Sequence, residues 1–247
     1  MLLAEGGYMV EKMGKLLFAE GREIGFDSAS EMAAQETLQA LADESVTLFE
    51  GTLISRQKLA RVDILIKRGN EFRLIEVKAK SFDGREDAAA KAEGRPSLFW
   101  RKKGGGIVSE WQEYLEDVAF QVLVLRELFP KAVIHPFLLM PDKAKTTQIE
   151  QFHSFFQIRR IQKPGSKFTR LLVDFTGDVQ RLRADHFLSL VPVGAEIQHL
   201  LPGVAEAAAE YVASLSPVLQ RIKTPISVAC KNCEYRVGRA DGRDGYR

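Results

Sequence analysis

Two short apolar runs joined by a tight turn constrain the fold of this chain more than any other stretch. Residues 62–66 and 72–77 are rich in β-branched and aromatic side chains, and Gly69-Asn70 between them is a two-residue hairpin signal. If Gly69 and Asn70 form the turn, each residue of the first strand lies opposite the residue whose number, added to its own, gives 139. The pattern therefore predicts an antiparallel hairpin in which Asp63 faces Glu76.

The predicted hairpin gathers charged side chains on one face. Because side chains alternate along a strand, Glu76, Lys78 and Lys80 share a face, and Asp63 joins them through its pairing. The two carboxylates would lie about 5 Å apart, and like charges placed directly opposite each other destabilise a sheet. Mg²⁺ or Mn²⁺, which favour carboxylate oxygens, would compensate. The alternative is an ordinary solvated face, with Asp63 paired to Lys78 or to Arg61.

These residues resemble the PD-(D/E)XK nuclease superfamily, in which an Asp precedes a Glu-x-Lys motif, here Asp63 and Glu76-Val77-Lys78. The runs 63–81 and 114–121 resemble its RecB-like branch. More narrowly, the chain is similar to a bacterial family in which a nuclease-like half precedes a domain of unknown function. The resemblance extends over residues 4–236. It implies an α/β fold: a central mixed β-sheet flanked by helices, with a restriction-endonuclease-like core.

The resemblance also implies roles for four residues. Asp63 and Glu76 would bind Mg²⁺ or Mn²⁺, Lys78 would orient the attacking water or stabilise the developing charge, and Gln121 would hold the lysine or a substrate phosphate. The implied activity is metal-dependent hydrolysis of phosphodiester bonds in DNA, with single-stranded or end-directed cleavage favoured and RNA not excluded. The alternative is a non-catalytic nucleic-acid-binding or scaffold module that retains the fold.

Three further polar residues are candidates to complete a metal site. Glu50 interrupts an apolar strand over residues 46–53 and is a third candidate metal ligand, although it could equally face solvent from an edge. Gln35 and Glu36 lie on a helix predicted over residues 31–41, and many relatives carry a polar ligand on the helix that precedes the sheet. An exposed position on an amphipathic helix explains Gln35 and Glu36 as well.

Two stretches combine aromatic and basic residues, a composition suited to nucleic-acid contact. Residues 82–107 lack sustained periodicity and are predicted to form a loop insertion, in which Trp100, Arg101 and Lys102 are candidate nucleic-acid-binding residues. The stretch 151–173 contains five Lys or Arg and no acid, and Arg159 and Arg160 are its candidates. A surface insertion with a packed tryptophan and a solvated charged face are the alternatives.

Other elements follow from periodicity and from turn signals. The helix over residues 31–41 is expected to bury Met32, Leu38 and Leu41, and Ser109 is expected to cap a long helix that ends before Pro130. Further helices are predicted over residues 8–18 and 197–219, and further strands over residues 133–140, 171–175 and 187–193.

Composition places the chain among ordinary globular proteins. Its 247 residues are 45% hydrophobic and 28% charged, and they are expected to form a single domain with a cysteine-containing tail over residues 226–247. The formal net charge of +2 gives no overall basic signature, so any nucleic-acid footprint must be local. Without a signal peptide or a long apolar run, the protein is expected to be cytoplasmic with no membrane partner.

Cys230 and Cys233 have the spacing of zinc or iron–sulfur ligands. Two ligands do not make a site, so an iron–sulfur cluster requires missing ligands that lie outside this chain. A C-terminal domain absent from this chain is accordingly an expected partner, beside DNA.

Overall fold

The computed structural model of the chain describes residues 2–18, 20–25, 30–162, 169–215, 217–222 and 230. The chain divides into two compact units, Met1–Ala208 and Ala209–Arg247. The first unit holds the sheet and every residue that lines the pocket described below. The second contains the last residues of a long helix that begins in the first unit, and its exposed side chains include Tyr211 and Leu215.

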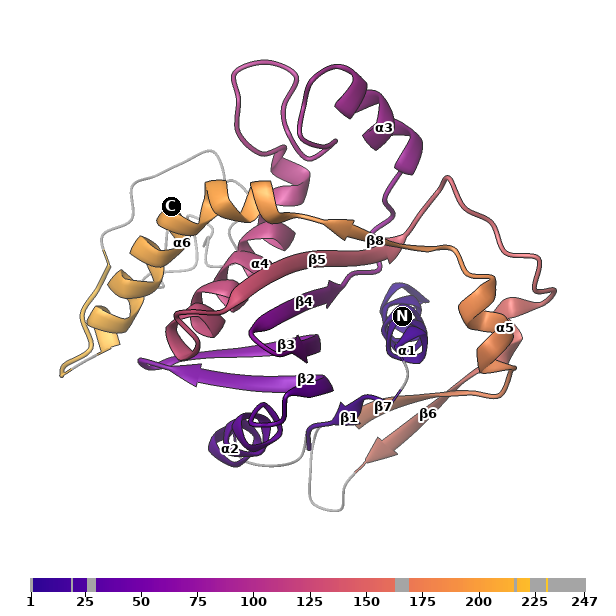
Figure 1. Cartoon of the computed structure of the whole chain (residues 1–247), viewed down its shortest axis with the longest axis horizontal. Coiled ribbons are helices and arrows are strands. Elements are labelled where there is room, and N and C mark those ends of the chain that lie inside the picture. Colours follow the sequence, from indigo (N-terminus) through magenta and orange to yellow (C-terminus); the bar gives the residue numbers. More distant parts are fainter. Residues whose placement is uncertain are drawn as a thin grey trace, which may run out of the picture. The chain divides into compact units, whose positions relative to one another are not determined.

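A six-stranded mixed sheet forms the centre of the first unit, in the order β1-β2-β3-β4-β5-β8 (Figure 1). The pairs β1–β2 and β4–β5 are parallel, and the other neighbours are antiparallel. The strands are β1 (Arg22–Glu23), β2 (Ser45–Ser55), β3 (Lys58–Arg68), β4 (Glu71–Val77), β5 (Val133–Pro141) and β8 (Leu188–Pro192). The predicted α/β class with a mixed sheet flanked by helices is confirmed.

Helices and a separate hairpin surround this sheet. The helices are α1 (Leu2–Leu17), α2 (Ser30–Ala40), α3 (Gly84–Ala92), α4 (Ser109–Leu128), α5 (Val179–Ala184), α6 (Gly194–Leu215) and the 3-10 helix η1 (Phe152–Phe155). The hairpin pairs β6 (Phe156–Gln162) with β7 (Thr169–Phe175) in antiparallel fashion. Among the described residues, no helix is long and apolar enough to cross a membrane.

The two faces of the sheet carry separate hydrophobic cores. Residues of α2, α4 and the start of α6 pack on one core with Leu48, Leu65 and Leu74 of the strands. Residues of α1 and α5 pack on the other core with Ile64 and Ile75. Burial of β3 and β4 on both faces explains why their sequences are nearly continuous apolar runs, and it leaves little room for charges without partners.

A glycine allows α1 to lie close to the sheet. A Cβ atom at Gly14 would lie 3.1 Å from Leu139 Cδ2 and 3.2 Å from Val77 Cγ2, which is tighter than most real contacts. The helix therefore passes directly over the end of β4, where the predicted Glu-x-Lys motif lies.

The segment 82–107 is more regular than the predicted loop insertion. It contains helix α3, whose first turn is capped by the Asp83 side chain accepting from the N–H groups of Arg85 and Glu86. The residues that α3 buries are Asp87 and Ala90. Because neither is a large apolar residue, the sequence of α3 lacks the apolar periodicity from which a helix is predicted. The prediction of a loop was wrong over these nine residues.

Two finer expectations were also wrong. Met32 and Leu38 are 60% and 42% exposed, because α2 instead buries its small residues and Thr37 against β2. The Thr37 hydroxyl accepts from the N–H of Thr52, which fixes the helix close to the strand. The long helix α4 does begin at Ser109, but its N-cap is Val108, and no side chain caps it.

Candidate active site

The predicted register of the β3–β4 hairpin is confirmed. Pairing runs from Arg68 opposite Glu71 to Ile64 opposite Ile75, and each pair sums to 139. Gly69 has φ +58°, as a tight turn at this position requires. Asp63 and Glu76 occupy the next positions along the two strands, beyond the last of these pairs.

The strands are distorted at the position where the carboxylates lie. Val62 and Leu65 pack in the core on the α4 face whereas Ile64 packs in the core on the α1 face, so the simple alternation of side chains breaks next to Asp63. On the neighbouring strand, Glu50 has φ +57°, an unusual conformation for a residue other than glycine. Local distortions of this kind re-aim side chains, and they are common beside active sites.

Asp63 is held by the backbone of the opposite strand. Its Oδ2 atom accepts a hydrogen bond of 2.7 Å from the N–H of Val77. Burial, and then repulsion from the Glu76 carboxylate, raise the pKa of Asp63 well above its usual range. Burial likewise raises the pKa of Glu76, although the Lys78 ammonium opposes that change. Two carboxyl groups that resist ionisation side by side favour a bound proton or a bound cation.

Lys78 lies between two carboxylates. Its Nζ atom is 2.8 Å from Glu76 Oε1 and 2.8 Å from Asp117 Oδ2, and it is 5.8 Å from the centre of the Tyr114 ring. Partial burial works to lower the pKa of Lys78, but Glu76 and Asp117 outweigh it and raise that pKa above its usual value. The side chain is therefore a permanent ammonium group at neutral pH.

Gln121 reaches the same carboxylates from the middle of α4. Its Nε2 atom donates to Glu76 Oε2 at 2.8 Å and to Asp117 Oδ1 at 3.3 Å. The side chain is only 3% exposed, and within the described part of the chain its Oε1 atom accepts no hydrogen bond. Since a buried acceptor without a partner is destabilising, Oε1 is suited to a ligand, a water or a metal-bound group.

Helix α1 forms the other side of a pocket beside these groups. The pocket has a volume of about 340 Å³ and is lined by Gly7, Tyr8, Glu11, Asp63, Glu76, Val77, Lys78 and Ala79. Sequence reasoning missed Tyr8 and Glu11 as site residues. The available signal was the Gly6-Gly7 pair within an otherwise amphipathic helical pattern.

The candidate helix ligands on α2 do not line this pocket. Glu36 Oε1 instead accepts from Arg22 Nη2 at 2.8 Å, and α1 contributes the helical carboxylate, Glu11. Gln35 is likewise absent from the pocket lining. Their positions agree with the alternative of an ordinary place on the surface of an amphipathic helix, and α1 is the helix that crosses the end of β4.

Glu50 is engaged by α1 and does not line the pocket. Lys15 Nζ lies 2.7 Å from Glu50 Oε1 and 3.0 Å from Glu11 Oε1, and all three side chains lie on the α1 side of the sheet. Burial raises the pKa of Glu50, while Lys15 supplies the compensating charge. The structure thus provides Glu50 with an ammonium partner on α1.

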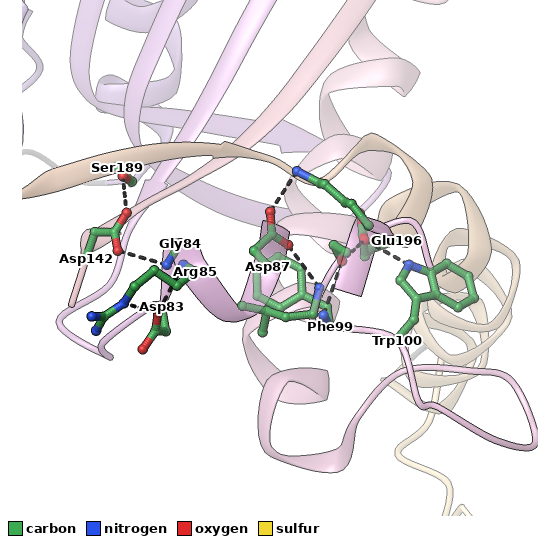
Figure 2. Close-up of polar contacts among 12 residues, drawn as sticks. Asp83, Gly84, Arg85, Asp87, Phe99, Trp100, Asp142, Ser189 and Glu196 are labelled. Carbon is green, nitrogen blue, oxygen red and sulfur yellow. Dashed lines mark hydrogen bonds and ion pairs between the residues drawn. The ribbon is translucent and has the colours of Figure 1, made fainter. Parts of the chain in front are cut away.

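The predicted nucleic-acid-binding residues of segment 82–107 belong to a different network. Trp100 Nε1 donates to Glu196 Oε1 at 2.8 Å (Figure 2). The Trp100 ring also lies 5.0 Å from that of His199. Trp100 is therefore an anchor on α6. Arg101 and Lys102 are exposed beside a turn at residues 104–106, and Lys102 Nζ lies 3.4 Å from Glu93 Oε1.

The remaining candidates lie elsewhere. Arg159 on β6 is exposed, and its Nε atom donates to Asp174 Oδ2 across the β6–β7 hairpin at 2.5 Å. Arg160 is also exposed on β6. Cys230 is partly exposed, whereas Cys233 lies outside the described residues, as does most of the tail over residues 226–247.

Comparison with protein families, with curated proteins and with solved structures found no match to this chain.

The donor set fits a hard divalent cation that keeps several of its waters. In the part of the chain described, no three His, Cys, Asp or Glu side chains gather closely enough to hold a metal by themselves. Mg²⁺ does not need three, because one or two carboxylates plus waters and substrate oxygens commonly bind it. Asp63 and Glu76 supply two carboxylates beside an open pocket.

Proposed function

We propose that this chain is a Mg²⁺- or Mn²⁺-dependent nuclease that hydrolyses phosphodiester bonds in DNA. The observation that supports it best is the pair of carboxyl groups with raised pKa values, the half-buried Asp63 and the buried Glu76, beside the Lys78 ammonium at one pocket. Strongly perturbed titratable groups gathered in a cleft are typical of catalytic sites. We also propose that the chain is related to the RecB-like nucleases and that it is cytoplasmic.

Asp63 and Glu76 would hold the metal. When bound, Mg²⁺ or Mn²⁺ would supply charge neutralisation at the phosphate and lower the pKa of water. The hydrogen bond from Val77 N–H to Asp63 and that from Gln121 to Glu76 fix the two carboxylates before any ligand arrives.

Lys78 would stabilise negative charge on the phosphate in this reaction. A lysine that accepts a proton from water must first be neutral, and Glu76 and Asp117 keep this one protonated by raising its pKa. An ammonium donor aimed at the developing charge is the role that remains. Asp117 and Gln121 position the ammonium and the metal-binding carboxylate from one turn of α4.

Cleavage of end-labelled DNA with Mg²⁺ or Mn²⁺ tests the proposal. Glu76→Gln and Lys78→Ala should each lower the cleavage rate by at least a hundredfold, because each removes a charge that acts at the scissile phosphate. Lys80→Ala is the matched control. Its ammonium lies 4.7 Å from the centre of the Trp111 ring and outside the pocket lining, so the rate should change little.

A non-catalytic binding module is the second candidate, and one observation favours it. Lys78 already pairs with Glu76 and Asp117, so these charges are satisfied without a metal. That candidate predicts salt-sensitive DNA binding by the wild type, no metal-dependent cleavage, and no effect of Lys78→Ala. Equal cleavage by the wild type, Glu76→Gln and Lys78→Ala would refute the proposed site.

A further inference from the structure

The pocket beside Asp63 has little positive charge with which to attract DNA. Three carboxyl groups line it, those of Glu11, Asp63 and Glu76. The ammonium of Lys78 also lines it, but this group already pairs with Glu76 and with Asp117. Proteins hold DNA mainly through Lys and Arg side chains that displace counterions from its phosphates. Most of the affinity for a DNA substrate must therefore come from a cationic surface outside the pocket.

The turn at residues 101–106 offers such a surface. Arg101, Lys102 and Lys103 are the only three consecutive basic residues in the sequence, and all three are exposed. Glu93 Oε1 lies 3.4 Å from Lys102 Nζ, but both of these side chains are exposed. Because an exposed ion pair of this kind contributes little, the three positive charges remain available to an anion.

Three glycines give the same turn its backbone shape. Gly104, Gly105 and Gly106 have φ +80°, +69° and +75°, and a Cβ atom at each would meet no atom within 4 Å. Within the described residues, the N–H groups of residues 102–106 donate to no acceptor in the protein. Successive N–H groups in turns can form concave sites for anions. The turn thus presents backbone donors together with its cations.

Hydrogen bonds fix the base of this turn. The N–H of Arg101 donates to the Gly106 C=O at 3.0 Å, and Arg101 Nε donates to the Ile107 C=O at 3.0 Å. The adjacent Trp100 is held on Glu196, so its ring is an anchor and not a surface for stacking bases (Figure 2). Because the base of the turn is already ordered, binding there loses less conformational entropy.

A row of aromatic rings connects the turn with the pocket. The Trp111 ring in the first turn of α4 lies 4.9 Å from that of Phe99 and 6.1 Å from that of Tyr114. The Tyr114 ring in turn lies 5.8 Å from Lys78 Nζ. A polymer with regularly spaced phosphates can therefore contact both places. A membrane fits less well, because residues 101–106 include no apolar side chain that could insert among lipids.

We propose that the turn at residues 101–106 binds phosphates of the DNA backbone outside the cleavage pocket, through its three cations and the N–H groups of its glycines. The choice of DNA as the polyanion rests on the proposed function. Lys103 and the glycine backbone take part in this contact, and Trp100 does not. The turn holds the substrate without regard to base sequence, while the groups of the pocket act on one phosphate.

Fluorescence anisotropy with a short labelled DNA duplex in EDTA tests the proposal, because binding is then measured without cleavage. Arg101→Gln, Lys102→Gln and Lys103→Gln should each weaken binding severalfold, and each should lower the slope of log K against log salt concentration by about one. Lys131→Gln is the matched control and should bind like the wild type. Lys131 is exposed beyond the far end of α4, and the 20 residues of that helix span about 30 Å.

One glycine tests the backbone donors. Gly105→Asn should bind like the wild type, because Asn tolerates a positive φ. Gly105→Val should weaken binding without changing the salt slope, since it distorts the turn and keeps the cations. Far-ultraviolet circular dichroism establishes that each variant is folded. Equal binding by both glycine variants would overturn the role of the backbone donors.

Cleavage assays with Mn²⁺ on the same variants separate this proposal from the nuclease. Lys102→Gln and Lys103→Gln should raise KM and leave kcat unchanged, because they lose binding that the ground state and the transition state share. Loss of binding in these variants, without any cleavage by the wild type, would support the turn as the DNA contact and overturn the nuclease. Cleavage by the wild type with unchanged affinity and salt slope in the three basic variants, or with an equal loss in Lys131→Gln, would overturn the DNA contact and leave the nuclease standing. Tighter binding of the wild type to phosphatidylserine vesicles than to DNA would also overturn it.

Discussion

At the scale of single residues, the site is governed by the cost of burying like charges. Asp63 and Glu76 both have raised pKa values because burial penalises their ionised forms, and the repulsion between them adds to the effect on Asp63. Lys78 compensates Glu76 directly, whereas Asp63 relies on one backbone N–H. Of the two carboxylates, Asp63 is therefore the one whose negative charge has less compensation in the metal-free protein.

Asp63→Asn should stabilise the metal-free protein at neutral pH. A group with a raised pKa in the folded state contributes stability below its unfolded pKa of about 3.9, and that contribution is lost as pH rises through the folded pKa. The variant removes this loss, and its amide oxygen can still accept from Val77. Thermal melts in EDTA should show the variant melting above the wild type at pH 8 and close to it at pH 4. A difference of about 1 kcal/mol corresponds to roughly 2–4 °C.

Adding Mn²⁺ should reverse this order. A cation that binds the folded state stabilises it by mass action, so the wild type should gain melting temperature with Mn²⁺ and Asp63→Asn should gain little. Equal gains in both proteins would contradict a metal site at Asp63.

At the scale of elements, the position of α1 decides what the site contains. The close approach at Gly14 brings α1 over Val77, and this places Tyr8 and Glu11 at the pocket one to two turns away. The Lys15–Glu50 pair holds the same helix to β2. The geometry of the pocket therefore depends on the packing of one helix as much as on the hairpin.

Substitutions at two glycines of α1 should have opposite effects on stability. Gly6→Ala fills open space and should raise stability by about 0.5–1 kcal/mol, because alanine favours the helix. Gly14→Val should lower it by about 1–3 kcal/mol, since the side chain would collide with Leu139 and Val77. Urea denaturation gives both values. Stabilisation by Gly14→Val would contradict the packing described.

At the scale of the whole molecule, buried acids hold segment 82–107 to distant parts of the first unit. Asp142 accepts from Gly84 N–H at 2.9 Å and from the Ser189 hydroxyl at 2.7 Å (Figure 2). Glu196 accepts from the Ser97 hydroxyl at 2.5 Å and from Trp100 at 2.8 Å. These contacts connect residues far apart in the sequence, and they fix a segment whose own helix buries little.

Glu196→Ala should loosen segment 82–107 without unfolding the β3–β4 hairpin. The change leaves the Ser97 hydroxyl and the Trp100 N–H without their buried acceptor, at a cost of about 1–3 kcal/mol for each group. Hydrogen exchange should rise over residues 97–107 and stay low over β3 and β4. Lys103→Ala, at an exposed position of the same segment, is the control and should change neither. Uniform exchange across the unit in Glu196→Ala would show that the contact holds the whole fold.

The hairpin could be predicted from the sequence because its determinants are local. A two-residue turn signal and the alternation of strands specify the register, and the register brings Asp63 next to Glu76. The apolar pattern of α4 is similarly self-contained, so the placement of Gln121 in the middle of a long helix followed from it. Helix α3 and the buried face of α2 escaped prediction because their contacts use alanine, threonine and a buried aspartate in place of large apolar residues.

By itself, the sequence determined the α/β class, the hairpin and the residues Asp63, Glu76 and Lys78 at its end. Only the tertiary structure decided that α1 covers these residues with Tyr8 and Glu11, that Glu50 pairs with Lys15, and that Trp100 anchors on Glu196. The physical reason is the range of the interactions. Turn chemistry and strand alternation act between near neighbours, whereas the packing of a helix on a sheet depends on contacts that no local pattern records.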